Sequence, residues 1–393
     1  MSRELFARNP DLKSLRDEGY FVEIRGALLV MREVPYVDSK KCVRRGTLVS
    51  GLTLAGDVTQ KPDSHQVWFD GEFPCNADGT ELKGIGHSSG NYDLGNGVTA
   101  KYHFSSKPRD SGYTDYHEKM TTYAGVISGP AAVLEEGANP RVFRTPEDER
   151  DGVFNYLDTA SARVGIGALS EKLSHETVSL VGLGGTGSYV LDLVAKTPVR
   201  EIRLFDGDEF LQHNAFRAPG APAIEELREV FPKVEYFRGI YSRMHRRVVA
   251  HRTFLRADNV HLLDGTTFAF LSMDAGEDKR GVVRHLEKIG AAFVDVGMGL
   301  DLDADGMLGG ILRVTASTPE KRDHVHGGRI SFVGGGADDV YASNIQVVEL
   351  NAMNAALAVM KWKKIRGFYR DAEREHHSTY TTESNLLING DLP

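Results

Sequence analysis

VGLGGTG, at residues 181–187, predicts a tight turn that joins a buried strand to a helix. The residues before it, 177–181, are mostly apolar or β-branched, which is typical of a strand inside a parallel sheet. A helix is expected over residues 188–196. A phosphate group would then lie at the N-terminus of this helix, where free backbone N–H groups attract anions.

Each glycine of the turn has an expected role. Gly182 would permit the sharp change of direction, and Gly184 and Gly185 would let backbone N–H groups approach the phosphates. Gly187 would let the helix pack closely on the strand. Such a turn also occurs in proteins that bind NAD or FAD, so alone it indicates a nucleotide without indicating the reaction.

Polar residues after the next predicted strand, 201–205, separate these possibilities. A dehydrogenase needs one acidic residue there to bind the ribose. This chain places Asp206, Asp208, Asn214 and Arg217 within one short segment. The excess of polar groups favours chemistry at the phosphates over hydride transfer.

Two further residues complete a longer pattern. Lys233 precedes a predicted helix, and Asp274 follows an apolar strand at residues 268–273. In this order the motifs resemble those of the ThiF/MoeB/HesA adenylyltransferases, the superfamily that includes the ubiquitin-activating enzymes. The resemblance covers residues 163–299, and it implies a Rossmann-like ThiF-type adenylation domain.

The resemblance also implies a reaction and its cofactors. A carboxylate, in this superfamily the C-terminal glycine of a ubiquitin-like protein, attacks the α-phosphate of ATP, and pyrophosphate leaves. Asp206 and Asp208 would hold the ribose, and Asn214 would bind phosphate or orient the arginine. Arg217 and Lys233 would neutralise phosphate charge, and Asp274 would hold Mg²⁺ directly or through water.

A basic residue from the neighbouring subunit reaches the ATP in members of this superfamily. Arg163 is the candidate for that role here, and the resemblance therefore implies a homodimer. Solvation at a helix surface is the alternative for this arginine.

The chain has only two cysteines, Cys42 and Cys75. They cannot form the paired CxxC motifs that hold zinc in many relatives, so no zinc is expected. No cysteine lies where ubiquitin-activating relatives carry their catalytic thiol. The acyl-adenylate would then pass directly to another protein, or form an oxyester at Ser317 with His324 or His326 as base, or react with Cys75.

General composition indicates a soluble cytoplasmic protein of two domains. The chain has 393 residues, 41% of them hydrophobic, which is enough for two cores. Its net charge of −8 argues against nucleic acid or an anionic membrane as partner. No stretch is long and apolar enough for a membrane span.

The expected domains are an N-terminal domain of uncharacterised function at residues 1–135, a linker and lead-in helix at 136–160, and the adenylation domain at 161–393. Short apolar runs between turns predict a smaller α+β or mainly β fold for the first domain. Residues 45–50, 104–108 and 348–352 resemble bacterial proteins that combine such a domain with a ThiF-like one. These proteins belong to ubiquitin-like conjugation systems, some of them linked to antiviral defence.

Towards the C-terminus, strands are expected at residues 310–314 and 329–333, and a long helix at 344–368. The sequence as a whole favours an adenylyltransferase that acts on a ubiquitin-like protein or peptide, with a ubiquitin-conjugating-like carrier as a further partner. The alternatives are a non-catalytic module that docks a ubiquitin-like protein, and an NAD(P)- or FAD-dependent oxidoreductase.

Overall fold

The computed structural model describes residues 2–108, 112–143, 152–156, 158–163, 166–333 and 346–392. The chain divides into two compact units, at residues 1–171 and 172–393. The expected domain boundaries at 135/136 and 160/161 lie earlier in the sequence and remain a prediction. Part of the expected linker, residues 144–151 and 157, lies outside the described residues.

The first unit is built on an antiparallel sheet with the strand order β1-β2-β3-β6-β8-β7. Helices α2 and α3 contribute apolar side chains to its main core, among them Leu12, Leu15 and Tyr123. The strands are β1 (Phe21–Arg25), β2 (Leu28–Val37), β3 (Val43–Gly51), β4 (Leu54–Ala55), β5 (Val58–Thr59), β6 (Gln66–Asp70), β7 (Gly86–Gly95) and β8 (Val98–Ser105). The helices are α1 (Ser2–Arg8), α2 (Pro10–Asp17), α3 (Tyr116–Leu134), α4 (Thr159–Arg163) and α5 (Gly167–Glu171).

Local sequence explains where the main helix of this unit begins. Asp115 is the N-cap of α3, and its side chain accepts a hydrogen bond from the backbone N–H of Glu118. Glu118 in turn accepts a hydrogen bond from the backbone N–H of Thr114 at 2.7 Å. The first unit is an α+β domain, as the pattern of short apolar runs predicts.

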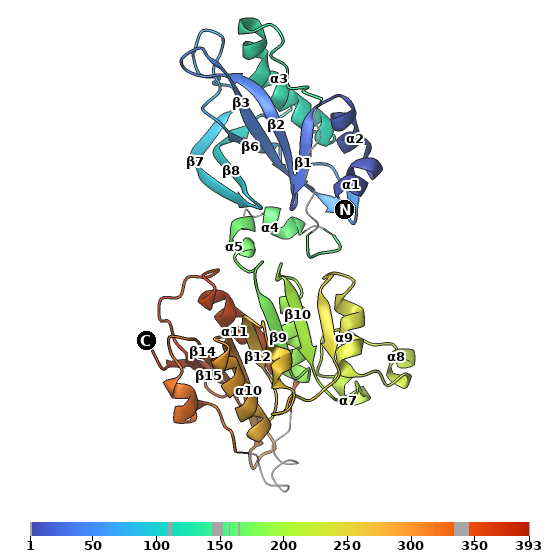
Figure 1. The fold of residues 1–393 in the computed structure, drawn as a ribbon, viewed down its shortest axis with the longest axis vertical. Helices are drawn as coiled ribbons and strands as arrows, with labels where there is room; N and C mark the ends of the chain where they lie inside the picture. Colours follow the sequence, from blue (N-terminus) through green and yellow to red (C-terminus); the bar gives the residue numbers. More distant parts are fainter. Residues whose placement is uncertain are drawn as a thin grey trace. The chain divides into compact units, whose positions relative to one another are not determined.

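The second unit is a Rossmann-like α/β domain. Its eight-stranded sheet has the order β11-β10-β9-β12-β13-β14-β15-β16 (Figure 1). The strands from β11 to β13 pair in parallel, and those from β14 to β16 continue the sheet in antiparallel pairs. The strands are β9 (Thr177–Val181), β10 (Glu201–Phe205), β11 (Val248–His251), β12 (Phe268–Leu271), β13 (Ala292–Leu302), β14 (Leu308–Ser317), β15 (His377–Thr381) and β16 (Leu386–Gly390).

Helices cover both faces of this sheet. Side chains of α6, α9 and α11 pack in one core with β9, β10 and β12, and those of α10 pack in a second core on the other face. The helices are α6 (Gly185–Val194), α7 (Gln212–Ala215), α8 (Ile224–Arg228), α9 (Lys233–Tyr241), α10 (Glu277–Lys288) and α11 (Val348–Ile365), with a 3-10 turn at Val260–Leu263 and a π-helical turn at Val325–Arg329.

The strand order of this sheet reverses at β9. After β9 the chain moves to β10 and β11 on one side, and then crosses to β12 and β13 on the other. In open α/β sheets, ligands bind where the strand order reverses in this way. The loops after β9, β10 and β12 therefore meet at the expected nucleotide edge.

One predicted element in this unit is wrong. The strand expected at residues 329–333 is instead the end of the π-helical turn at Val325–Arg329 and the irregular segment after it. Gly328 has φ of +102°, a conformation that breaks an extended strand. The short apolar run includes Ile330, which is buried in the second core without joining the sheet.

Candidate functional site: the nucleotide edge of the second unit

The glycine turn between β9 and α6 is too crowded for side chains at three positions, Gly182, Gly185 and Gly187. Gly182 has φ of +89°, and a Cβ atom there would lie 2.6 Å from the carbonyl oxygen of Ser272. A Cβ atom on Gly187 would lie 2.0 Å from the carbonyl oxygen of Gly182. Around Gly184, the N-cap of α6, no atom lies within 4 Å of a hypothetical Cβ. The turn is therefore tightly packed on its inner side and open at Gly184, the N-cap of α6.

Gly185 makes room for a side chain that the sequence had not singled out. A Cβ atom on Gly185 would lie 2.1 Å from Nδ2 of Asn351, a fully buried residue of α11. The Thr186 hydroxyl donates to Oδ1 of Asn351 at 3.0 Å. The absence of a side chain at Gly185 thus lets α11 approach the turn, beside its expected role near phosphate. The stretch 348–352 carries a family resemblance, but the sequence does not indicate this role of Asn351, because the contact joins segments 165 positions apart.

Asp206, at the end of β10, connects the glycine turn to the acidic loop. Its Oδ2 accepts a hydrogen bond from the backbone N–H of Leu183 at 2.7 Å, and its Oδ1 accepts one from the N–H of Asp208 at 2.9 Å. The side chain is buried, and this burial raises its pKa against the opposing influence of Lys233 and the two N–H donors. A buried carboxylate in this loop is held in one orientation.

Lys233 begins α9, and its side chain lies beside the carboxylates of the loop after β10. Its Nζ is 2.6 Å from Oδ2 of Asp208 and 3.8 Å from Oδ1 of Asp206. The lysine side chain is 8% exposed, whereas that of Asp208 is 55% exposed. The buried ammonium group of Lys233 therefore contacts the solvent-accessible carboxylate of Asp208. This arrangement suits the binding of a polar, charged ligand.

Asn214 and Arg217 come from α7 and the turn after it. The Asn214 side-chain oxygen accepts a hydrogen bond from the N–H of Leu211 at 2.9 Å, and the backbone N–H of Arg217 donates to the Asn214 carbonyl at 3.1 Å. Nδ2 of Asn214 and Nε of Arg217 are buried without a hydrogen-bond partner among the described residues. Unpaired buried donors of this kind are rare and call for an acceptor.

The charges of this loop converge near His213. Burial lowers the pKa of His213, and the positive charges of Arg217 and Lys233 lower it further. Both cations therefore lie close enough to act on one imidazole. The structure brings Asp206, Asp208, Asn214, Arg217 and Lys233 together at one edge of the sheet.

Asp274 lies in the loop between β12 and α10, and its carboxylate is exposed. Ser272, two residues before Asp274, ties the loop to the glycine turn, because its hydroxyl donates to the Gly182 carbonyl at 2.7 Å. Among the described residues, no group of three or more His, Cys, Asp or Glu side chains is arranged to hold a metal ion. A single exposed carboxylate suits Mg²⁺, which keeps several waters and is shared with substrate phosphates.

The remaining predicted residues make no described contact with this cluster. Ser317 ends β14 and is fully buried, and its hydroxyl has no hydrogen-bond partner among the described residues, so it is not an exposed nucleophile. His324 is also buried and contacts the Ala316 carbonyl, not Ser317. Cys75 belongs to the first unit, where burial raises the pKa of its thiol. The side chain of Arg163, at the end of α4, lies outside what the structure describes.

The raised pKa of Asp206 predicts a measurable cost in stability. The folded-state pKa of Asp206 lies above its unfolded-state pKa. As pH rises through the range between these two values, ionisation of the carboxyl group therefore lowers the stability of the fold. Asp206→Asn should therefore raise the melting temperature at pH 7 by a few degrees, and the difference should vanish near pH 3. The exposed Asp301→Asn serves as control in calorimetry. An increase in melting temperature that is equal at pH 7 and pH 3 would contradict this prediction.

Comparisons with known proteins give a family for the first unit only. Residues 10–159 match the model of a family described as a domain of unknown function, DUF6791. The search among curated proteins gave no significant match.

Solved structures resemble the chain at low identity. E. coli MccB with succinimide is 14% identical, with a TM-score of 0.46 over 58% of this chain and 67% of MccB. E. coli MccB with ATP is 15% identical, with a TM-score of 0.45 over 59% and 71% of the two chains. PaaA is 14% identical, with a TM-score of 0.44 over 57% and 75%. The Rossmann-like class of the second unit rests on its own strand order and register.

No helix among the described residues is long and apolar enough to cross a membrane.

Proposed function

We propose that the protein activates the C-terminal carboxylate of a ubiquitin-like protein or peptide by transferring AMP to it from ATP. The observation that carries this proposal is the group of cations beside the glycine turn. Lys233 is buried against Asp206 and Asp208, and Arg217, in the turn after α7, has a buried Nε with no hydrogen-bond partner among the described residues. Phosphoryl-type transfer needs this combination, because catalysis consists mainly of positioning and charge neutralisation.

The residues present fit ATP. The open start of α6 at Gly184 offers N–H groups to phosphates, and the exposed side of Asp208 can accept hydrogen bonds from ribose hydroxyls. The unpaired donors of Asn214 and Arg217 would find acceptors in phosphate oxygens.

Mg²⁺ fits the exposed carboxylate of Asp274. When bound, this ion would neutralise charge on the leaving pyrophosphate. Asp274 would hold the ion, directly or through water, in the loop that Ser272 ties to the glycine turn.

The proposed reaction requires no nucleophile from the protein. An oxygen of the substrate carboxylate forms a bond to the α-phosphorus, the bond from that phosphorus to the bridging oxygen of the β-phosphate breaks, and pyrophosphate leaves with the electron pair. Arg217 and Lys233 would stabilise the negative charge that shifts to the leaving group. The side chains of this loop therefore act by position and charge alone.

Two other functions are less well supported by the same site. An oxidoreductase needs an acidic residue at the position of Asp206. It does not need a buried cation such as Lys233 beside that residue. A non-catalytic docking module has no need to keep Arg217 and Asn214 with unpaired buried donors.

The acyl-adenylate would be handed directly to a carrier or acceptor protein. Ser317 and Cys75 are both buried, so neither is placed to accept the acyl group in the described conformation. A ubiquitin-conjugating-like carrier is the proposed next partner, in a bacterial conjugation or defence system. The first unit would then bind the ubiquitin-like substrate or this carrier.

A homodimer in which Arg163 reaches the neighbouring ATP is also part of the proposal. An Arg163→Ala chain and an Asp274→Ala chain should each be inactive, and a mixture should regain part of the activity through hybrid dimers with one intact site. Exchange assays on the mixture, with sedimentation as a measure of assembly, test this. A fully active monomer would rule the shared site out.

Pyrophosphate exchange tests the proposed function. Ubiquitin-like proteins encoded beside this chain should each be offered with ATP, Mg²⁺ and labelled pyrophosphate, and one should support label incorporation into ATP. The same protein without its last residue is the matched control and should support none. Exchange that is independent of the carboxylate substrate would contradict the proposal.

A further inference from the structure

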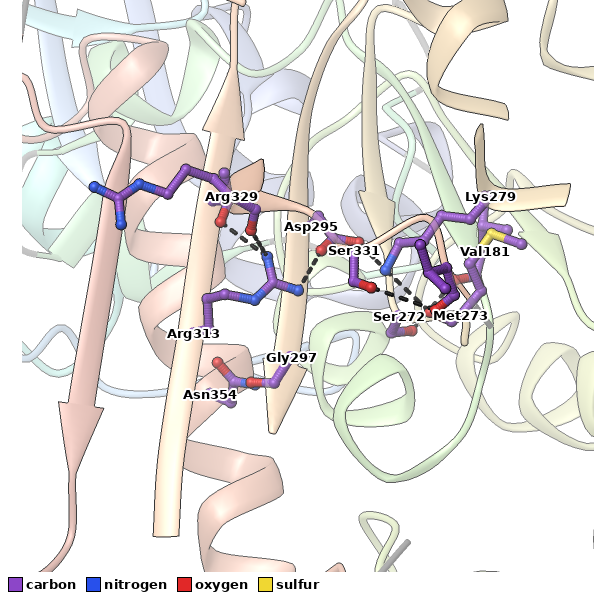
Figure 2. A network of polar contacts seen from close by, with 12 residues as sticks. Val181, Ser272, Met273, Lys279, Asp295, Gly297, Arg313, Arg329, Ser331 and Asn354 are labelled. Atoms are coloured by element: carbon purple, nitrogen blue, oxygen red, sulfur yellow. Dashed lines mark hydrogen bonds and ion pairs between the residues drawn. The ribbon is translucent and has the colours of Figure 1, made fainter. Parts of the chain in front are cut away.

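Lys279 is a buried cation near the nucleotide edge that the sequence motifs do not include. It lies in the first turn of α10 and is 3% exposed. Its Nζ is 2.5 Å from Oδ1 of Asp295 and donates to the carbonyl oxygen of Met273 at 3.2 Å (Figure 2). The ammonium group thus joins a strand in the sheet to the loop that carries Asp274.

Asp295, the partner of Lys279 in this contact, is held in a fixed position. It is fully buried in β13, where it pairs with Leu271 at the end of β12. Its other oxygen, Oδ2, accepts a hydrogen bond from Nη2 of Arg313 at 2.6 Å (Figure 2). Because the carboxylate has two cationic partners, removal of Lys279 would still leave it paired with Arg313. A buried carboxylate with no partner would be much more costly to the fold.

The same loop is tied at its other end to the glycine turn. The backbone N–H of Ser272 donates to the Val181 carbonyl at 2.9 Å, and its hydroxyl donates to the Gly182 carbonyl at 2.7 Å. Ser272 and Met273, the two residues before Asp274, are therefore each anchored by a polar contact. The exposed carboxylate of Asp274 follows directly from this anchored pair.

We propose that Lys279 and Ser272 are positioning residues that set the distance between Asp274 and the glycine turn, and so determine how tightly Mg²⁺ and ATP bind together. This inference rests on the proposed function, in which Asp274 holds Mg²⁺. Partners that orient a metal-binding group affect metal affinity without touching the metal, commonly by about 10–100-fold. Lys279 has this relation to Asp274 through the Met273 carbonyl.

Titration calorimetry of ATP tests the inference on the full chain, once with excess Mg²⁺ and once with a chelator. The Mg²⁺-dependent gain in ATP affinity should be lost in Asp274→Ala, and it should fall by about tenfold or more in Lys279→Met and in Ser272→Ala. Affinity for metal-free ATP should stay within about twofold of wild type in all three. Lys288→Met, an exposed site on the same helix, is the control and should behave as wild type.

The outcomes separate this inference from the proposed function. If Lys279→Met and Ser272→Ala keep the full Mg²⁺-dependent gain while Asp274→Ala loses it, the positioning role is wrong and the proposed function stands. If the wild-type chain binds no ATP, the proposed function fails, and the inference fails with it. If Lys279→Met does not fold, Ser272→Ala decides, because it removes one anchor without disturbing a buried charge.

Discussion

Arg217→Ala is expected to lower the rate of ATP–pyrophosphate exchange by at least about 100-fold. Nε of Arg217 is buried and has no hydrogen-bond partner among the described residues. Replacement by alanine therefore breaks no hydrogen bond at this atom. Removal of the guanidinium should leave stability nearly unchanged and abolish charge neutralisation at the phosphates. Initial exchange rates at saturating ATP, together with a melting curve, measure both effects.

Arg228→Ala is the matched control for this prediction. Arg228 lies at the end of α8, its side chain is 72% exposed, and its Nη1 is 3.9 Å from Oε1 of Glu225. Loss of a surface arginine of this kind should change exchange by less than about twofold. Equal rates in the wild type and in Arg217→Ala would remove Arg217 from the proposed site.

Gly187→Ala is expected to abolish nucleotide binding and to destabilise the second unit. Its Cβ atom would lie 2.0 Å from the carbonyl oxygen of Gly182 and 2.4 Å from the hydroxyl of Ser272. Both neighbours belong to the packed inner side of the turn, so the backbone must shift to admit a methyl group. We expect ATP affinity to fall by at least about 100-fold and the melting temperature to drop by several degrees.

Gly239→Ala provides the comparison for that change. Gly239 lies inside α9, and no atom lies within 4 Å of a Cβ atom placed there. Alanine at an open helical position should stabilise the chain by about 0.5–1 kcal/mol and leave ATP affinity unchanged. If both alanine variants bind ATP equally well, the glycine turn is not the phosphate site.

Much of the second unit could be predicted because its signals are local. The strand bounds Thr177–Val181 and Glu201–Phe205 follow from short apolar runs beside a glycine turn and an acidic loop, and the structure confirms them. The helix after the turn begins earlier than expected, at Gly185 in place of residue 188. Helix ends depend on capping geometry, which the apolar pattern does not contain.

The remaining features depend on contacts between distant segments. Asn351 approaches the turn from α11, and Lys279 of α10 reaches Asp295 in β13, so no spacing of motifs reveals either contact. Ser317 is the reverse case, a residue that the sequence offered as a candidate and that the structure buries. The hydroxyl-bearing segment at residues 315–319 made Ser317 a candidate for an oxyester, but β14 extends through residue 317 and the side chain is buried. Period-two strand patterns with polar residues are easily taken for loops when the partner strands are unknown.

The fate of a labelled oxygen tests the central claim most directly. A ubiquitin-like substrate with ¹⁸O in its C-terminal carboxylate should be incubated with the protein, ATP and Mg²⁺, and the adenylate should then be transferred or hydrolysed before mass spectrometry of the nucleotide. Adenylation of the carboxylate should give AMP that carries one ¹⁸O atom, because the carboxylate oxygen bonds to the α-phosphorus. Unlabelled AMP, or ADP as the product, would contradict adenylation of the carboxylate.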